Sequence, residues 1–96
     1  MFKADSARAN VMNHQQKISK KVLETVSQLA ERFGNDIAYR SELGYTTAEY
    51  APYTVENFPI DGTIDMAKDL FEKIFKENGY TVLLNNPMDN TLKVQW

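Results

Sequence analysis

The chain has 96 residues, enough for one domain (residues 1–96), and its 43% hydrophobic and 11% aromatic content is that of a folded protein. The absence of cysteine excludes disulfides and thiolate metal sites, and a single histidine leaves little to bind zinc or iron, so we expect no metal and no cofactor. The net charge of −2 is unevenly distributed, with a balance of +4 over residues 1–21 and −6 over residues 22–65. This distribution argues against a dedicated nucleic-acid-binding protein, which needs a larger basic excess.

Residues 5–34 predict one long helix. The apolar positions of this segment recur mostly three or four residues apart, as on a helix with one buried face: Val11, Ile18, Val22, Val26, Leu29 and Phe33. Gly34 offers a C-terminal stop. Such a helix is about 40 Å long, which exceeds the diameter of a globule of this size, so we expect part of it to project or to pack against a second chain.

The stretch that follows is the least regular of the chain. Residues 36–43 alternate well enough to predict a strand, which Gly44 ends. Residues 45–58 are rich in Tyr, Thr, Ala and Glu and contain Pro52, so we expect a long surface loop with a short strand around residues 53–55.

The last third of the chain predicts a second helix and a hairpin. Five apolar residues recur at helical spacing, ahead of a stop at Asn78-Gly79: Ala67, Leu70, Phe71, Ile74 and Phe75. Residues 80–84 and 91–96 read as two strands joined by a turn. We therefore predict an α+β fold with a long N-terminal helix, a second amphipathic helix and a small three-stranded, mainly antiparallel sheet that ends in a C-terminal hairpin, both helices lying on one face.

Sequence motifs of catalysis are missing. The sequence contains no G-x-S-x-G elbow, no P-loop and no G-x-G-x-x-G, and its four glycines are scattered singly. A cysteine nucleophile is excluded, and a Ser-His-Asp triad would need His14, which lies in a polar helical stretch. We therefore expect a protein that is not an enzyme and has no catalytic residues.

The tyrosine-rich segment supplies the main candidate binding surface. Tyrosine offers a large contact area at low entropy cost and is enriched at interfaces. We expect a patch that is aromatic at its centre and acidic at its edge, suited to a basic protein partner, and formed by Tyr45, Glu49, Tyr50 and Tyr53. If these rings are core instead, the binding surface must be sought elsewhere, on the lysine face of the first helix.

That helix carries the alternative site. Lys17, Lys20 and Lys21 fall on one helical face and could contact phosphate, which would make the protein a nucleic-acid-associated regulator. A nucleic-acid partner is the less favoured alternative. The length of the helix and the small core together predict a homodimer or a higher oligomer.

The pattern of elements resembles the small accessory proteins of tailed bacteriophages. This resemblance is based on an opening helix with Ser6-Ala7-Arg8, a later helix ending at residues 79–82 and the last strand at residues 92–96. The resemblance implies an interaction protein that binds and modulates or inhibits a host protein; a small structural protein of a virus particle is a further alternative. With no apolar run long enough for a membrane span, we expect no membrane partner and a place in the cytoplasm of the host cell.

Overall fold

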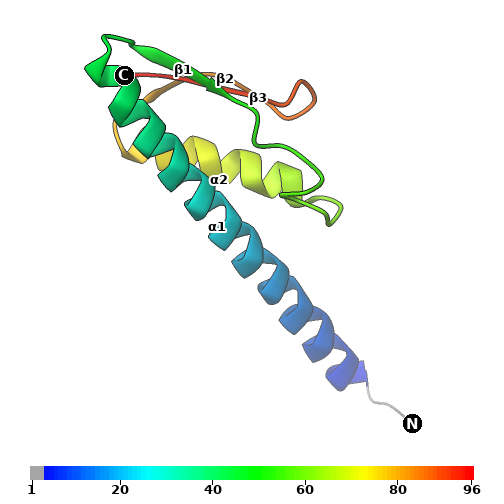
Figure 1. Cartoon of the computed structure of the whole chain (residues 1–96). Helices are drawn as coiled ribbons and strands as arrows, with labels where there is room; N and C mark the ends of the chain where they lie inside the picture. Colours follow the sequence, from blue (N-terminus) through cyan, green and yellow to red (C-terminus); the bar gives the residue numbers. More distant parts are fainter. Residues whose placement is uncertain (1–3) are drawn as a thin grey trace.

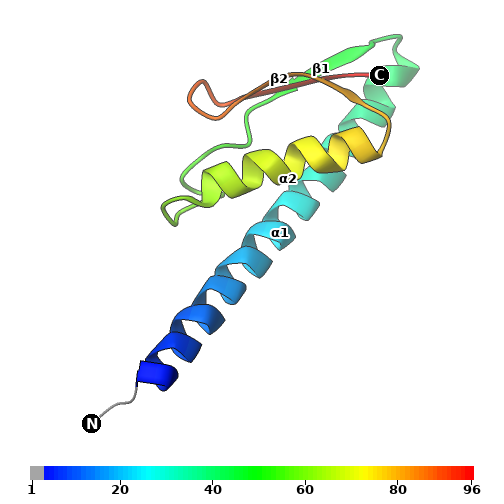
Figure 2. The same cartoon turned by 180° about the vertical axis from the view of Figure 1, so that it is seen from behind.

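The computed structural model describes the backbone of residues 4–96 and the side chains of residues 17–96. Along the chain it contains α1 (Ala4–Glu42), β1 (Thr47–Tyr50), α2 (Thr63–Glu77), β2 (Thr81–Asn86) and β3 (Thr91–Gln95). The three strands form one antiparallel sheet, and Figures 1 and 2 show both helices on the same face of it. The predicted α+β fold, with its long first helix, second helix and C-terminal hairpin, is confirmed.

The sheet has the order β1-β3-β2, so the last strand of the chain is central. Val94 of β3 lies between Ala48 of β1 and Val82 of β2, and these side chains face the helices. Leu92 and Val94 are fully buried, because alternate residues of a strand point to the same face. Trp96, which follows β3, is half-buried and packs against the edge of this core.

The core lies between the sheet and the two helices. Phe71 of α2 is fully buried at its centre, where its ring lies 6.0 Å from that of Phe33 and 5.9 Å from that of Tyr53. From α1, Val22, Val26 and other residues at helical spacing complete the packing. The core-facing pattern predicted for both helices is therefore present along their described residues.

α1 runs eight residues further than predicted, because Gly34 does not end it and residues 36–42 are helical rather than a strand. A glycine inside a helix costs about 1 kcal/mol relative to alanine, and packing on both sides of Gly34 outweighs that cost. Phe33 packs against the core, and Ile37 is 4% exposed. The glycine that ends the helix is Gly44, with φ of +89°, where the amide of Tyr45 donates to the carbonyl of Arg40 at 3.1 Å.

The first strand of the sheet also lies elsewhere than predicted. It is β1, within the segment expected to be a loop, while residues 55–57 form a turn rather than a strand. β1 has a weak strand composition, and it forms because β3 offers an unpaired edge. Ala48 pairs there with Val94, and Tyr50 pairs with Leu92.

The molecule is elongated, because α1 passes well beyond the rest of the fold. A helix of 39 residues measures about 58 Å, and Figure 1 shows its N-terminal part extending past α2 and the sheet. The radius of gyration is 16.6 Å, against about 12.5 Å for a compact domain of this length. The projection expected from helix length is present, and it leaves part of α1 outside the single core.

Candidate functional site

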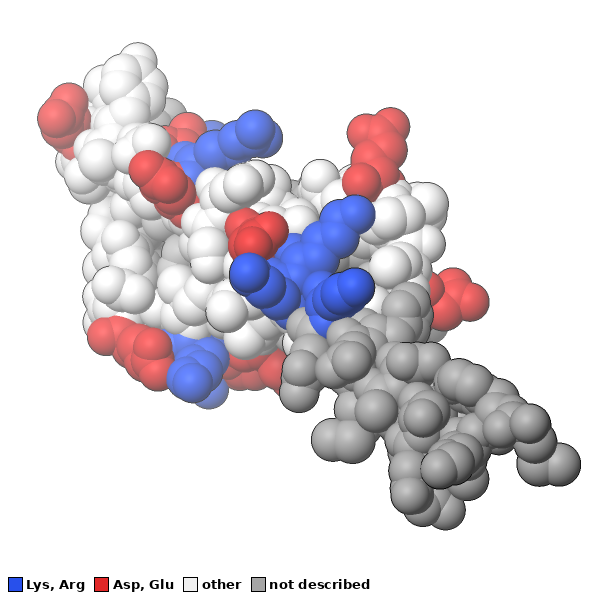
Figure 3. Space-filling model, turned by 90° about the horizontal axis from the view of Figure 1, so that it is seen from below, with Lys and Arg blue, Asp and Glu red and all other residues white. Residues whose placement is uncertain are grey.

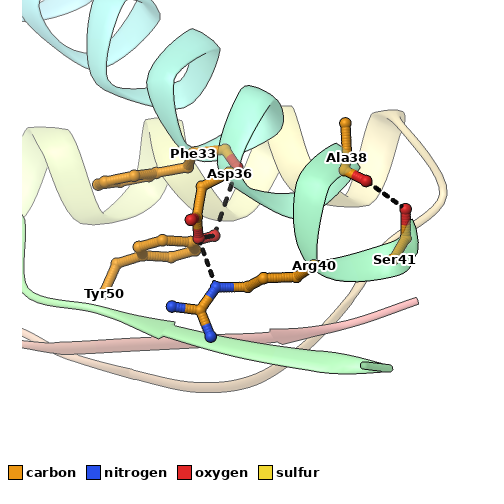
Figure 4. Close-up of polar contacts among 6 residues, drawn as sticks. All are labelled: Phe33, Asp36, Ala38, Arg40, Ser41 and Tyr50. Carbon is orange, nitrogen blue, oxygen red and sulfur yellow. Dashed lines mark hydrogen bonds and ion pairs between the residues drawn. The ribbon is translucent and has the colours of Figure 1, made fainter. Parts of the chain in front are cut away.

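Tyr50 lies under α1 and takes part in a polar cluster there (Figure 4). Its ring stacks on Phe33 with centroids 4.1 Å apart, and its hydroxyl donates to Asp36 Oδ2 at 2.7 Å. Arg40 Nε donates to the same oxygen at 2.6 Å, one helical turn further along α1. The cluster therefore ties β1 to the C-terminal part of α1.

These contacts shift the pKa of the Asp36 carboxyl and of the Tyr50 hydroxyl. The hydrogen bonds from Tyr50 and then from Arg40 favour the ionised carboxylate and lower the pKa of Asp36 below its ordinary value. Burial, followed by the hydrogen bond to the Asp36 carboxylate, raises the pKa of Tyr50 well above its ordinary value. The tyrosine thus stays protonated as a donor, while the aspartate stays ionised as an acceptor.

Replacing Tyr50 with phenylalanine should raise the pKa of Asp36 towards its ordinary value. A carboxylate with a lowered pKa stabilises the fold above pH about 4, and that stabilisation is lost as pH falls through the lowered value. Tyr50→Phe should therefore weaken the acid-dependent part of the stability and cost about 1 kcal/mol at neutral pH. An NMR titration of the Asp36 carboxyl carbon checks this, and an unchanged pKa would contradict it.

The expectation of an exposed tyrosine patch is wrong for two of its members. Tyr53 is only 5% exposed; its hydroxyl donates to Asn85 Oδ1, and its backbone amide donates to Asn90 Oδ1 at 2.6 Å. Tyr50 is half-buried beneath α1. The ring of Tyr50 packs against the core because β1 forms a strand that turns it towards α1, and the loop after β1 places the ring of Tyr53 against Phe71.

The other two members of the predicted patch are at the surface. Tyr45 is 56% exposed at the end of α1, and Glu49 is exposed on the outer face of the sheet, opposite Lys93 in β3. The core tyrosines point to the other side of the sheet. The four residues therefore do not form a single patch, although Tyr45 and Glu49 remain open to contact.

The lysines of the alternative site are brought together. Lys17, Lys20 and Lys21 are all exposed on α1. Figure 3 shows basic side chains at several places on one face of the molecule, each with acidic side chains close by, so this face has mixed charge.

A hollow of the described surface lies along α1 rather than at the predicted tyrosine patch. One part holds about 400 Å³ between α1 and the C-terminal end of α2, and a second part of about 310 Å³ continues it towards the end of α1. Both parts share Gly34, Asn78 and Tyr80, so we treat them as one feature, the α1 groove. Its α1 side is lined by Glu31, by Ile37 and by five small residues: Ser27, Ala30, Gly34, Ala38 and Ser41.

The opposite wall of the α1 groove combines apolar, aromatic and polar residues. Ile74, Tyr80 and Trp96 line it and are half-buried, and the exposed Asn78 lines both parts. The ring of Tyr80 packs edge-on against both Phe75 and Trp96, at 5.4 and 6.5 Å between centroids, which fixes the position of this wall. A groove with small residues on one side and aromatic side chains on the other can receive an elongated element such as a helix.

Nothing in the fold of the single chain requires a glycine at position 34 of the groove. Its φ is not positive, so no backbone conformation requires a glycine, and a Cβ placed there would meet no atom within 4 Å. The methyl group of an alanine would thus fit here and would stabilise the helix. The missing side chain instead leaves the helix backbone open to close approach from outside.

Sequence reasoning missed this site, although a signal was present. Ala30, Gly34 and Ala38 are spaced four residues apart and share one helical face. The prediction of a helix stop at Gly34 concealed that spacing, because it placed Ala38 in a strand. The aromatic wall comes from residues remote in sequence, so only the fold could reveal it.

Comparisons with protein-family models, curated proteins and solved structures give no match to this chain. Among the residues with described side chains, no three or more acidic or histidine residues gather as they would around a metal ion. Within the described part of the chain, no helix combines the length and the apolar character needed to cross a membrane.

Proposed function

We propose that this chain is a non-enzymatic protein-binding module whose α1 groove accepts an α-helix of another polypeptide. The observation that carries the proposal is the pairing of an unrequired helix glycine with a rigid wall of Tyr80 and Trp96. Small residues on one helix let a second backbone approach closely, and aromatic side chains supply contact area at low entropy cost.

The proposal keeps the expected interaction function but moves the binding surface. Two of the four predicted tyrosine-segment residues are core, whereas the two parts of the α1 groove share Gly34, Asn78 and Tyr80 at the described surface along α1. The resemblance to phage accessory proteins supports a role in the cytoplasm of a host cell. A nucleic-acid role remains the alternative, supported by the exposed lysines Lys17, Lys20 and Lys21.

Occupancy of the groove can be measured without knowing the partner. The chain has no cysteine, so Ala38→Cys in the groove and Gln28→Cys outside it give single reactive thiols on the same exposed helix. In bacterial cells expressing each variant, we expect a maleimide to modify Ala38→Cys at least tenfold more slowly than in dilute purified protein. Gln28→Cys should react at similar rates in both settings.

Two further measurements distinguish a helix bound in the groove from bound nucleic acid. Adding Gly34→Leu should abolish the protection of Ala38→Cys, because leucine fills the groove, while its better helix propensity should keep the melting temperature at or above the original. Equal reaction rates at the two cysteines in cells would contradict the proposal. Protection that disappears with nuclease or high salt would favour the nucleic-acid alternative instead.

A further inference from the structure

The part of α1 that projects from the fold matches the α1 groove in length. Among the described side chains of α1, Ile18 is the first that packs against the core, so the backbone of residues 4–17 extends about 20 Å beyond it. Figure 1 shows this end of α1 standing clear of α2 and the sheet. The groove runs along α1 from Ser27 to Ser41, which is about 21 Å.

The charge along α1 sets the direction in which two such helices can pair. Residues 4–21 carry four basic residues against one acid, a balance of +3, and residues 22–42 carry four acids against two basic residues, a balance of −2. Parallel helices would bring like charges together, whereas antiparallel helices bring the basic half of each beside the acidic half of the other. Antiparallel helix dipoles add to this preference.

An antiparallel pair that lays residues 4–17 of one copy along residues 27–40 of the other has its two-fold axis at residue 22. Lys20 then lies beside Glu24 of the second copy, and symmetry repeats this contact. Both residues are exposed in the single chain. Leu23, which is 47% exposed on the same helical side as Ser27 and Ala30, comes to the centre of the pair.

The fold leaves room for this arrangement. The side of α1 that packs on α2 and the sheet carries Val22, Val26 and Leu29. The groove face carries Ser27 and Ala30, each one position further along the helix than Val26 and Leu29, so it is rotated by roughly 100°. A second helix can therefore lie in the groove without displacing α2.

We propose that the occupant of the α1 groove is the N-terminal part of α1 from a second copy of this chain, in an antiparallel two-fold dimer. The inference rests on the proposed function and names the partner helix. Each copy then fills the groove of the other, and the part of α1 that projects from one core packs against the other core.

The first test is the mass of the full chain in solution. By light scattering at about 100 µM we expect twice the 11.0 kDa of one chain. Gly34→Leu should weaken association at least a hundredfold and give the single-chain mass, since it blocks both grooves of the dimer. The matched control is Gln28→Leu, an exposed α1 position outside the groove, which should remain dimeric.

The second test is the direction of pairing. Lys20→Glu should weaken the dimer at least tenfold by placing glutamates together, and Lys20→Glu with Glu24→Lys should restore it. Spin labels on Asn35→Cys, at another exposed position outside the groove, should lie roughly 40 Å apart in the antiparallel dimer and under about 25 Å in a parallel one.

A single-chain mass, a short spin-label distance or a Gly34→Leu variant that still dimerises would each overturn this inference. The failures of the two proposals can be told apart. A monomer whose Ala38→Cys thiol is nevertheless protected in cells leaves the proposed function standing with a different helix in the groove. A monomer whose thiol is unprotected removes both proposals.

Discussion

Replacing Phe71 with alanine should lower the free energy of unfolding by about 3–5 kcal/mol. Phe71 is fully buried where α2 meets both α1 and the sheet, and its ring contacts those of Phe33 and Tyr53. The substitution removes the aromatic contacts and leaves a cavity that three separate elements would have to close. A domain of this size has about 5–15 kcal/mol of stability in total, so much of it would be lost.

Urea denaturation followed by circular dichroism measures this effect. Phe71→Leu keeps most of the volume and should cost clearly less, about 1–1.5 kcal/mol, so the series remains informative if the alanine variant does not fold. The control is Val55→Ala, at a position 76% exposed, which should change stability by less than about 0.5 kcal/mol. A loss below about 1 kcal/mol for Phe71→Ala would show that the core is not organised around this ring.

The elements that could be predicted from sequence are those whose pattern is local and repeated. α2 has apolar residues at helical spacing and is followed by Gly79, with φ of +87°. The C-terminal hairpin has a turn at residues 87–90, and buried residues alternate along β3. In α2 and β3 the local pattern agrees with the fold.

The errors arose where tertiary contacts outweigh local preference. Gly34 favours a helix stop by only about 1 kcal/mol, and the burial of Ile37 together with the Asp36–Arg40 pair extends the helix past it. β1 has only four residues, and its strand conformation depends on pairing with β3, which lies more than forty residues later in the chain. Local sequence patterns cannot reveal a partner at that distance.

The candidate site was missed for a related reason. The α1 groove needs a helix that continues through Gly34 and a wall that includes Trp96 from the end of the described chain. The predicted helix stop at Gly34 excluded the first condition. The second depends on residues remote in sequence, which only the fold brings together. The prediction of self-association through α1 was derived independently, from helix length, and it remains open to the mass measurement.

The buried tyrosine of the loop after β1 provides the second large effect, and Tyr53→Ala should cost about 3–4 kcal/mol. The ring is 5% exposed, packs edge-on against Phe71, and carries a hydroxyl that donates to Asn85 Oδ1. Tyr53→Phe should cost less, about 1–2 kcal/mol, because it removes only the donor and leaves the ring in place.

Burial also raises the pKa of Tyr53 above its ordinary value, so the fold should lose stability at alkaline pH, where the tyrosine of the unfolded chain ionises first.

Tyr45→Ala is the matched comparison, because the two tyrosines lie in the same segment but differ in burial. Tyr45 is 56% exposed, so its replacement should change the free energy of unfolding by less than about 0.5 kcal/mol. Thermal and urea melts of the two variants decide whether this segment is core or surface. Similar losses of stability for the two variants would mean that both tyrosines are buried. A negligible loss for Tyr53→Ala would mean that its ring is at the surface, and the tyrosine segment would again be a candidate binding patch.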